Sequence, residues 1–255
     1  MDPLLESYRK LARILRTILT ELESELRPGR STRELEQIAE DAIHRAGVQS
    51  CFLGYRGYPA CITASVNDEV VNTSSSKRIL KEGDLLKLQV GIKDGIGFSY
   101  QAWTYFLGKP SKEDSLFVET GRIALSRAVA AVRSRGQIIP ISQAIQSTLE
   151  DAGYSVNKKY IGHGMGQTQH ELPMIPGYVL QGTPARPESL PDGKILSIQV
   201  IAHQGCDDCR TMNDNWSVVT RDHSRALLLS QIVVVREGAA EVLLEPRDSR
   251  PDGQL

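Results

Sequence analysis

The sequence predicts an α+β domain built from two similar halves that enclose a central cleft. Two helices, a glycine-containing turn between them and β-rich sequence after them occur once near the start of the chain and again about 107 residues later. Within each helical segment apolar residues recur at three- and four-residue steps, as in amphipathic helices. This repeat is too long for a solenoid, so we expect two pseudo-symmetric halves with their sheets packed together and their helices outside.

The first half begins with a helix over residues 4–26, which ends at Arg27-Pro28-Gly29. Ser31 and Glu34 form a capping-box pattern, which predicts a second helix as far as about Arg45. Strands are expected over residues 60–71, 84–92 and 98–107, where β-branched and aromatic residues are frequent.

The second half repeats this order. Helices are expected over residues 114–134 and 141–150, and strands over 195–202, 216–220 and 227–235. Residues 173–191 are rich in Gly and Pro and indicate a surface loop. We expect a single domain over residues 1–240 and a polar C-terminal tail over 241–255.

The charge balance excludes several classes of partner. The 255 residues carry 30 Lys and Arg against 31 Asp and Glu, a net charge of −1, so neither a nucleic acid nor an anionic membrane is an expected partner. Charges recur through the first 30 residues and leave no room there for a signal peptide or a spanning helix, so a cytoplasmic location is expected. The four cysteines predict reduced thiols, and the Cys206-Asp-Asp-Cys209 turn is interpreted as solvated rather than metal-binding.

Several motifs occur in a characteristic order along the chain. They are Leu53-Gly-Tyr-Arg-Gly-Tyr-Pro59, Ser65-Val-Asn67, Leu80-Lys-Glu-Gly-Asp84, Tyr160-Ile-Gly-His-Gly-Met-Gly166, His170-Glu-Leu-Pro173 and Arg210-Thr-Met212 through Trp216. In these motifs the sequence, from about residue 4 to 240, resembles the type I methionine aminopeptidases. The resemblance implies the pita-bread fold, which agrees with the two halves expected from the repeat.

The same resemblance implies a dinuclear metal site, in which two Asp, one His and two Glu hold two divalent cations. This sequence departs from that pattern at most of the ligand positions. His163 stands where the ligand His belongs, whereas Asn72 replaces a further His of the family. The positions that correspond to the four carboxylates are occupied by Gln89, Tyr100, Gln199 and either Ser230 or Gln231.

These four replacements contribute no negative charge at neutral pH, so nothing would balance the four positive charges of two divalent cations. We therefore expect no metal and no other cofactor, and no methionine aminopeptidase activity.

The side-chain pocket of the family is better retained. The resemblance places the cleft-lining positions at Phe52, Tyr55, Tyr58, Thr63, Gln169 and Trp216, with Gln89, Gln199 and Ser230 as further ligand contacts. Two imidazoles, His163 and His170, remain beside Tyr100, and such a trio could move protons. A role for each histidine as a hydrogen-bonded structural residue stays open.

The sequence-based hypothesis is therefore a repurposed, metal-independent enzyme. It would perform acid/base chemistry on a small amine- or peptide-like ligand in the central cleft, with His163, His170 and Tyr100 as catalytic residues. A non-catalytic protein that binds a ligand or another protein is the alternative, and a residual metalloaminopeptidase is the third possibility. The sequence leaves the oligomeric state open.

Overall fold

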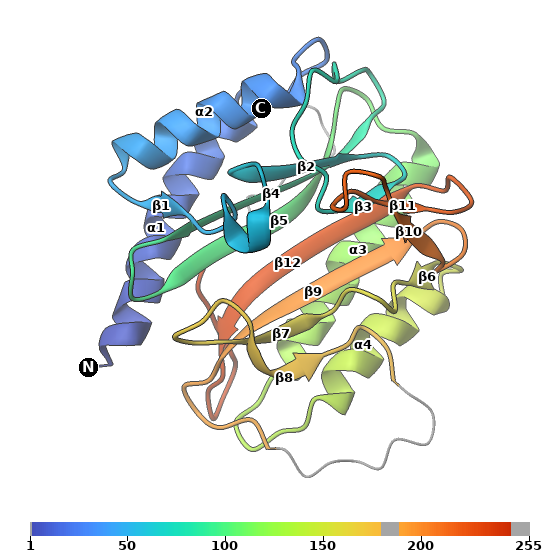
Figure 1. The fold of residues 1–255 in the computed structure, drawn as a ribbon. Coiled ribbons are helices and arrows are strands. Elements are labelled where there is room, and N and C mark those ends of the chain that lie inside the picture. Colours follow the sequence, from blue (N-terminus) through green and yellow to red (C-terminus); the bar gives the residue numbers. More distant parts are fainter. Residues whose placement is uncertain (1, 180–188, 246–255) are drawn as a thin grey trace.

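Two antiparallel sheets lie side by side at the centre of the molecule, and pairs of helices cover them from outside (Figure 1). The computed structural model describes residues 2–179 and 189–245. None of the helices in these two ranges is long and apolar enough to cross a membrane.

The first half contains one helical pair, a four-stranded sheet and a short 3-10 helix. Helices α1 and α2 pack on this sheet, and the apolar face of α1 is buried against β4 and β5. The elements are α1 (Pro3–Glu23), α2 (Thr32–Arg45), β1 (Gln49–Ser50), η1 (Tyr55–Gly57), β2 (Ile62–Val66), β4 (Leu85–Lys93) and β5 (Phe98–Phe106).

The second half is built in the same way. Its six-stranded sheet has the order β13-β12-β9-β7-β8 with β6 paired to β9, and helices α3 and α4 cover it from behind in Figure 1. The elements are α3 (Lys112–Ala131), α4 (Ile139–Glu150), β6 (Ser155–Val156), β7 (Gly162–Met165), β8 (Glu171–Ile175), β9 (Ile195–His203), β12 (Ala226–Val234) and β13 (Glu241–Val242). A third small sheet joins the halves through β10 (Cys209–Thr211), β11 (Val218–Thr220) and β3 (Glu69–Val71).

The predicted fold class is confirmed, and the four helices and the long strands lie where the sequence places them. The capping box is present, because the Ser31 hydroxyl accepts from Glu34 N while the Glu34 carboxylate accepts from Ser31 N. Two predictions need correction. Residues 173–175, at the start of the expected loop over 173–191, belong to β8, and β13 extends the folded part of the chain beyond residue 240, with Leu244 buried. Residues 180–188 of the expected loop lie outside the described ranges. Residues 246–255 of the predicted tail lie outside the described ranges.

The two large sheets meet where β5 runs beside β12. No regular ladder joins these strands; instead, side chains bond to the backbone of the other sheet. The Ser230 hydroxyl accepts a hydrogen bond of 2.8 Å from Ala102 N. Thr104 Oγ1 donates to Leu228 O at 2.9 Å and accepts from Leu228 N at 3.0 Å. We call this junction the β5–β12 seam.

The first helix and the last strand of the described chain are also tied together. Arg9 on α1 donates two hydrogen bonds to the carboxylate of Glu241 on β13, at 2.7 and 2.9 Å. Glu241 also accepts from Arg236, and these partners lower the pKa of Glu241 to about 2, with the bond to Arg9 as the largest cause.

Replacement of Ser230 by alanine should destabilise the seam. Ser230 is fully buried, so Ser230→Ala leaves the Ala102 amide without a partner, at a cost of about 1–3 kcal/mol in the free energy of unfolding. Urea denaturation would measure this difference. Ser147→Ala is the matched control, since Ser147 is exposed and bonds within α4, and it should change stability by less than about 0.5 kcal/mol. Equal effects of the two substitutions would contradict the role of the seam.

A fully buried lysine lies close to the seam. Lys87 on β4 is paired with Thr104 on β5, and its ammonium donates to Asn67 O at 2.6 Å. The same carbonyl accepts from Ala226 N, so Asn67 connects Lys87 with the second sheet. Burial lowers the pKa of Lys87 to about 7, while the carboxylates of Glu69 and Asp68 oppose this shift.

The buried lysine makes stability depend on pH. Between about pH 7 and its ordinary pKa near 10.5 the unfolded chain holds a proton that folded Lys87 has released, so stability rises with pH in this window. Relative to Lys87→Met, the wild-type protein should gain roughly 1 kcal/mol per pH unit. Urea denaturation at pH 7, 8.5 and 10 tests this, with the exposed Lys81→Met as control. Parallel profiles for wild type and Lys87→Met would contradict it.

Candidate functional site

Tyr100 and His163 form the centre of the site, one contributed by each sheet. The Tyr100 hydroxyl lies 3.0 Å from His163 Nε2, and His163 Nδ1 lies 2.9 Å from Gly164 O. A carbonyl oxygen can only accept, so Nδ1 carries the proton and Nε2 accepts from the tyrosine. Gln199 on β9 in turn donates to the Tyr100 oxygen at 3.5 Å.

The backbone of β7 requires glycine on both sides of His163. A Cβ atom at Gly162 would lie 2.4 Å from Ser197 O on β9, and one at Gly164 would lie 2.3 Å from Leu172 O on β8. The Gly-His-Gly sequence therefore lets β7 lie close between its neighbours and fixes the imidazole opposite Tyr100.

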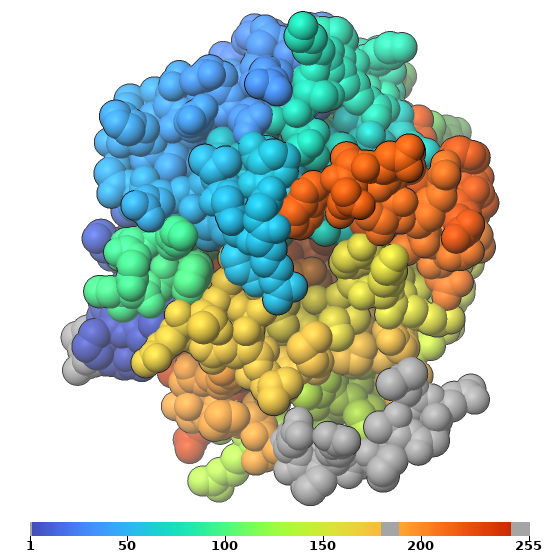
Figure 2. Space-filling view, in the orientation of Figure 1, coloured from blue at the N-terminus to red at the C-terminus, as the bar shows by residue number. Residues whose placement is uncertain are grey.

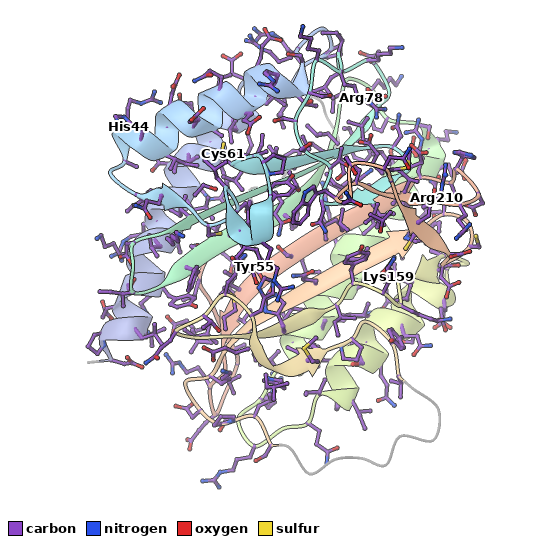
Figure 3. The ribbon with its side chains drawn as sticks, viewed as in Figure 1. His44, Tyr55, Cys61, Arg78, Lys159 and Arg210 are labelled. Atoms are coloured by element: carbon purple, nitrogen blue, oxygen red, sulfur yellow. The ribbon has the colours of Figure 1, made fainter. Side chains whose placement is uncertain are left out.

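His170 covers this centre from the side of solvent. Its ring centroid lies 4.3 Å from that of His163, and its other face stacks on Tyr55 at 5.5 Å. The Tyr55 hydroxyl and His170 Nδ1 are 3.1 Å apart. Figure 3 shows Tyr55 where η1 approaches β7 and β8, and in Figure 2 the segment around residue 55 (light blue) touches the segment around residue 170 (yellow).

These three groups are neutral at pH 7. Burial lowers the pKa of His163. Burial, the neighbouring His163 and the charge of Arg56 lower the pKa of His170 to about 4. Burial also raises the pKa of the Tyr100 hydroxyl. The main cause for both imidazoles is the same, since removing an imidazolium from water is costly and the neutral ring is favoured.

The strand register decides between Ser230 and Gln231. Ser230 is paired directly with Gln199 on β9, and its oxygen faces the seam. Gln231 instead donates to Leu244 O on the other side of the strand. Ser230 therefore occupies the position opposite Gln199. Its hydroxyl bonds to Ala102 N, and its role as a ligand contact stays a prediction.

An aromatic wall borders the centre. Phe52 lies 6.3 Å from Tyr100, and Tyr58 makes an edge contact of 5.1 Å with Trp216, both distances measured between ring centroids. Phe52 and Tyr58 are buried and Trp216 is half-buried. The predicted aromatic positions thus form two contacting pairs on the side of the cleft that η1 covers.

Two buried polar atoms among the predicted ligand contacts have no hydrogen-bond partner within the described residues. They are Oγ1 of Thr63, whose side chain is 4% exposed, and Oε1 of Gln169, whose side chain is 7% exposed. Thr63 is paired with Gln89, which is half-buried on the neighbouring strand. A buried polar atom without a partner costs about 1–3 kcal/mol, so a water molecule or another polar group that reached either atom would be stabilised there.

The donors at the centre do not fit two divalent cations. The imidazole of His163 and the amide of Gln199 contact the Tyr100 hydroxyl, and both nitrogens of His163 already have protein partners. Within residues 2–179 and 189–245 no group of three or more His, Cys, Asp or Glu could hold a metal ion. Hard and borderline cations need anionic ligands to balance their charge. The expected absence of a metal stays a prediction.

Two residues near the site escaped the sequence analysis. Tyr8 on α1 donates from its hydroxyl to Gly166 O at 2.9 Å and so holds the loop that leads to His170. Arg56 lies 5.5 Å from the Tyr55 ring, in a left-handed backbone conformation with φ of 50°. In the sequence, Tyr8 is one of the regularly spaced apolar residues of its helix and so resembles any core residue. Only its hydrogen bond to Gly166, 158 residues away, shows its role beside the site.

Comparison with known proteins identifies the family. The model of metallopeptidase family M24 matches residues 6–236, so the chain belongs to this family. It is 34% identical to methionine aminopeptidase 1 of Bacillus subtilis, over 92% of this chain and 94% of the relative. It is 32% identical to the methionine aminopeptidase of Clostridium acetobutylicum, over 95% and 96%. The crystal structure of the Thermotoga maritima methionine aminopeptidase superposes with a TM-score of 0.90 at 29% identity, covering 96% of this chain and 98% of that one.

These similarities correct the predicted function. The hypothesis of a repurposed, metal-independent enzyme, with a non-catalytic binding protein as its alternative, is wrong, because relatives that match nearly the whole chain are methionine aminopeptidases. The substituted carboxylate positions are few, whereas the similarity extends through both halves of the fold. The predicted family is confirmed.

The pKa of His170 can be measured directly. We expect the imidazole signals of His170 in NMR spectra to titrate near pH 4, and Arg56→Ala to raise that pKa, because it removes a nearby positive charge. Arg13→Ala, an exposed charge on α1, is the matched control and should leave the titration unchanged. A midpoint at the ordinary value near 6.5 would contradict the influence of His163 and Arg56 on this imidazole.

Proposed function

We propose that the chain acts as an aminopeptidase on peptides with a free amino-terminal residue. Full-length similarity to methionine aminopeptidases carries this proposal, with 34% identity over 92% of the chain. The retained aromatic wall of the cleft supports it.

The cleft suits the two parts of an amino-terminal residue. Phe52, Tyr58 and Trp216 offer aromatic surface to a flexible apolar side chain such as that of methionine. The free amino group is a hydrogen-bond donor, and Oγ1 of Thr63 and Oε1 of Gln169 are buried acceptors that lack a partner within the described residues.

The absence of charge on the three central side chains favours the binding of a positively charged amino group. His163, His170 and Tyr100 carry no charge at pH 7, so the positive amino group meets no cationic side chain among them. No catalytic step is assigned to a metal ion, because the donors around Tyr100 do not fit one. A cytoplasmic location and the absence of nucleic-acid and membrane partners stay predictions.

The test is release of the first residue from the peptide Met-Ala-Ser. The assay is run with added cobalt, manganese, iron or zinc and, separately, with a chelator. Free methionine should appear under at least one of these conditions, and none should appear from the N-acetylated peptide. Trp216→Ala should raise KM roughly tenfold, since an aromatic wall supplies much of a small ligand's contact.

The matched control is Tyr178→Ala, because Tyr178 is an aromatic residue whose hydroxyl bonds to Lys158 O rather than to the cleft. This variant should keep the wild-type KM. Absence of release under every condition from a peptide that binds would contradict the aminopeptidase reaction. Absence of binding to any free amino terminus, measured by calorimetry, would also contradict the substrate class.

A further inference from the structure

Exposed apolar side chains gather at the mouth of the cleft. Nine large apolar side chains are exposed in the described part of the chain, and four of these lie on η1 or its preceding loop and on β8. We call these four residues the apolar rim: Leu53 (52% exposed), Tyr55 (37%), Leu172 (75%) and Met174 (51%). Figure 2 shows the surface hollowed beside the contact between these two segments.

The rim is continuous with the centre of the site. Met174 is paired directly with His163, and side chains of directly opposed residues lie on the same face of a sheet. Tyr55 stacks on His170, which precedes Leu172 by two residues. The two halves of the rim therefore meet at the imidazoles.

The rim is uncovered because β8 is the edge of its sheet. Among the described strands β8 pairs with β7 alone, and η1 reaches only as far as His170. Exposed apolar patches of this kind next to a cleft are typical of binding surfaces. The opposite face of the same sheet is packed against α3 and α4, so the exposure is confined to the side of the cleft.

We propose that the apolar rim binds the third residue of a substrate peptide and favours an apolar side chain there. This inference rests on the proposed function, which places the first residue at the aromatic wall. An extended chain advances about 3.3 Å per residue, and neighbouring strands lie about 4.8 Å apart. The second residue then lies at His163 and His170, and the third lies over Leu172 and Met174.

The test compares three amidated peptides by calorimetry: Met-Ala, Met-Ala-Leu and Met-Ala-Ser. The wild-type protein should bind Met-Ala-Leu about five- to tenfold more tightly than Met-Ala-Ser, as expected for partial burial of one leucine side chain. The double variant Leu172→Ser/Met174→Ser should reduce this ratio to within about twofold and leave the affinity for Met-Ala unchanged.

The control is Leu116→Ser/Ile123→Ser, which removes two exposed apolar side chains from α3, behind the sheet in Figure 1. It should keep the wild-type ratio. A ratio near one in the wild type, or an unchanged ratio in the Leu172/Met174 variant, would overturn the rim proposal. So would a change from dimer to monomer in that variant with unaltered peptide affinities, which would assign the rim to self-association.

Failure of the proposed function gives a different pattern. If Met-Ala does not bind while Met-Ala-Leu binds through Leu172 and Met174, the rim proposal holds and the amino-terminal pocket fails. If none of the three peptides binds, both proposals fail.

Discussion

The β5–β12 seam is the contact on which the site depends, because each half of the chain supplies part of the cleft. Tyr100 belongs to β5, whereas His163 and Gln199 belong to the second sheet. A ladder would have merged the two sheets into one. Bonds from the Ser230 and Thr104 hydroxyls to backbone groups join them instead, and they fix the distance between Tyr100 and His163. A buried hydroxyl favours this one arrangement of the two sheets, because any other arrangement would leave the hydroxyl or its backbone partner without a hydrogen bond.

The site is organised by burial rather than by charge. Lys87 is an ionisable group inside this junction, and its pKa is lowered to about 7, while His170 is neutral above about pH 4. Desolvation is the largest cause of each shift, and for Lys87 it outweighs the opposing carboxylates of Glu69 and Asp68. A chain of hydrogen bonds between uncharged groups runs from Gln199 through Tyr100 and His163 to Gly164. These bonds, rather than ion pairs, hold the side chains around Tyr100 in place.

The sequence predicts the fold well because periodicity and capping act locally. The capping-box pattern from Ser31 to Glu34 predicts where α2 begins, and the repeated order of helices and strands predicts the two halves. Strand β8 was missed, since the Gly- and Pro-rich sequence around Pro173 masks an edge strand that pairs on one side only. Function is not predictable from Gln89 and Tyr100 alone, because they are single positions in a chain that is similar to methionine aminopeptidases over nearly its whole length. The stack of His170 on Tyr55 depends on residues 115 positions apart, which no local pattern reports.

The ion pair between Arg9 and Glu241 has a consequence for how the molecule is assembled. Helix α1 is synthesised before β13, because it precedes that strand by more than 200 residues. Until then Arg9 lacks its partner carboxylate, and β12 has not yet come to lie beside β5. Contacts this distant in sequence form late and slowly. The first half therefore keeps an uncovered sheet edge at β5 until β12 has been synthesised, and during this interval the growing chain is most exposed to wrong pairing.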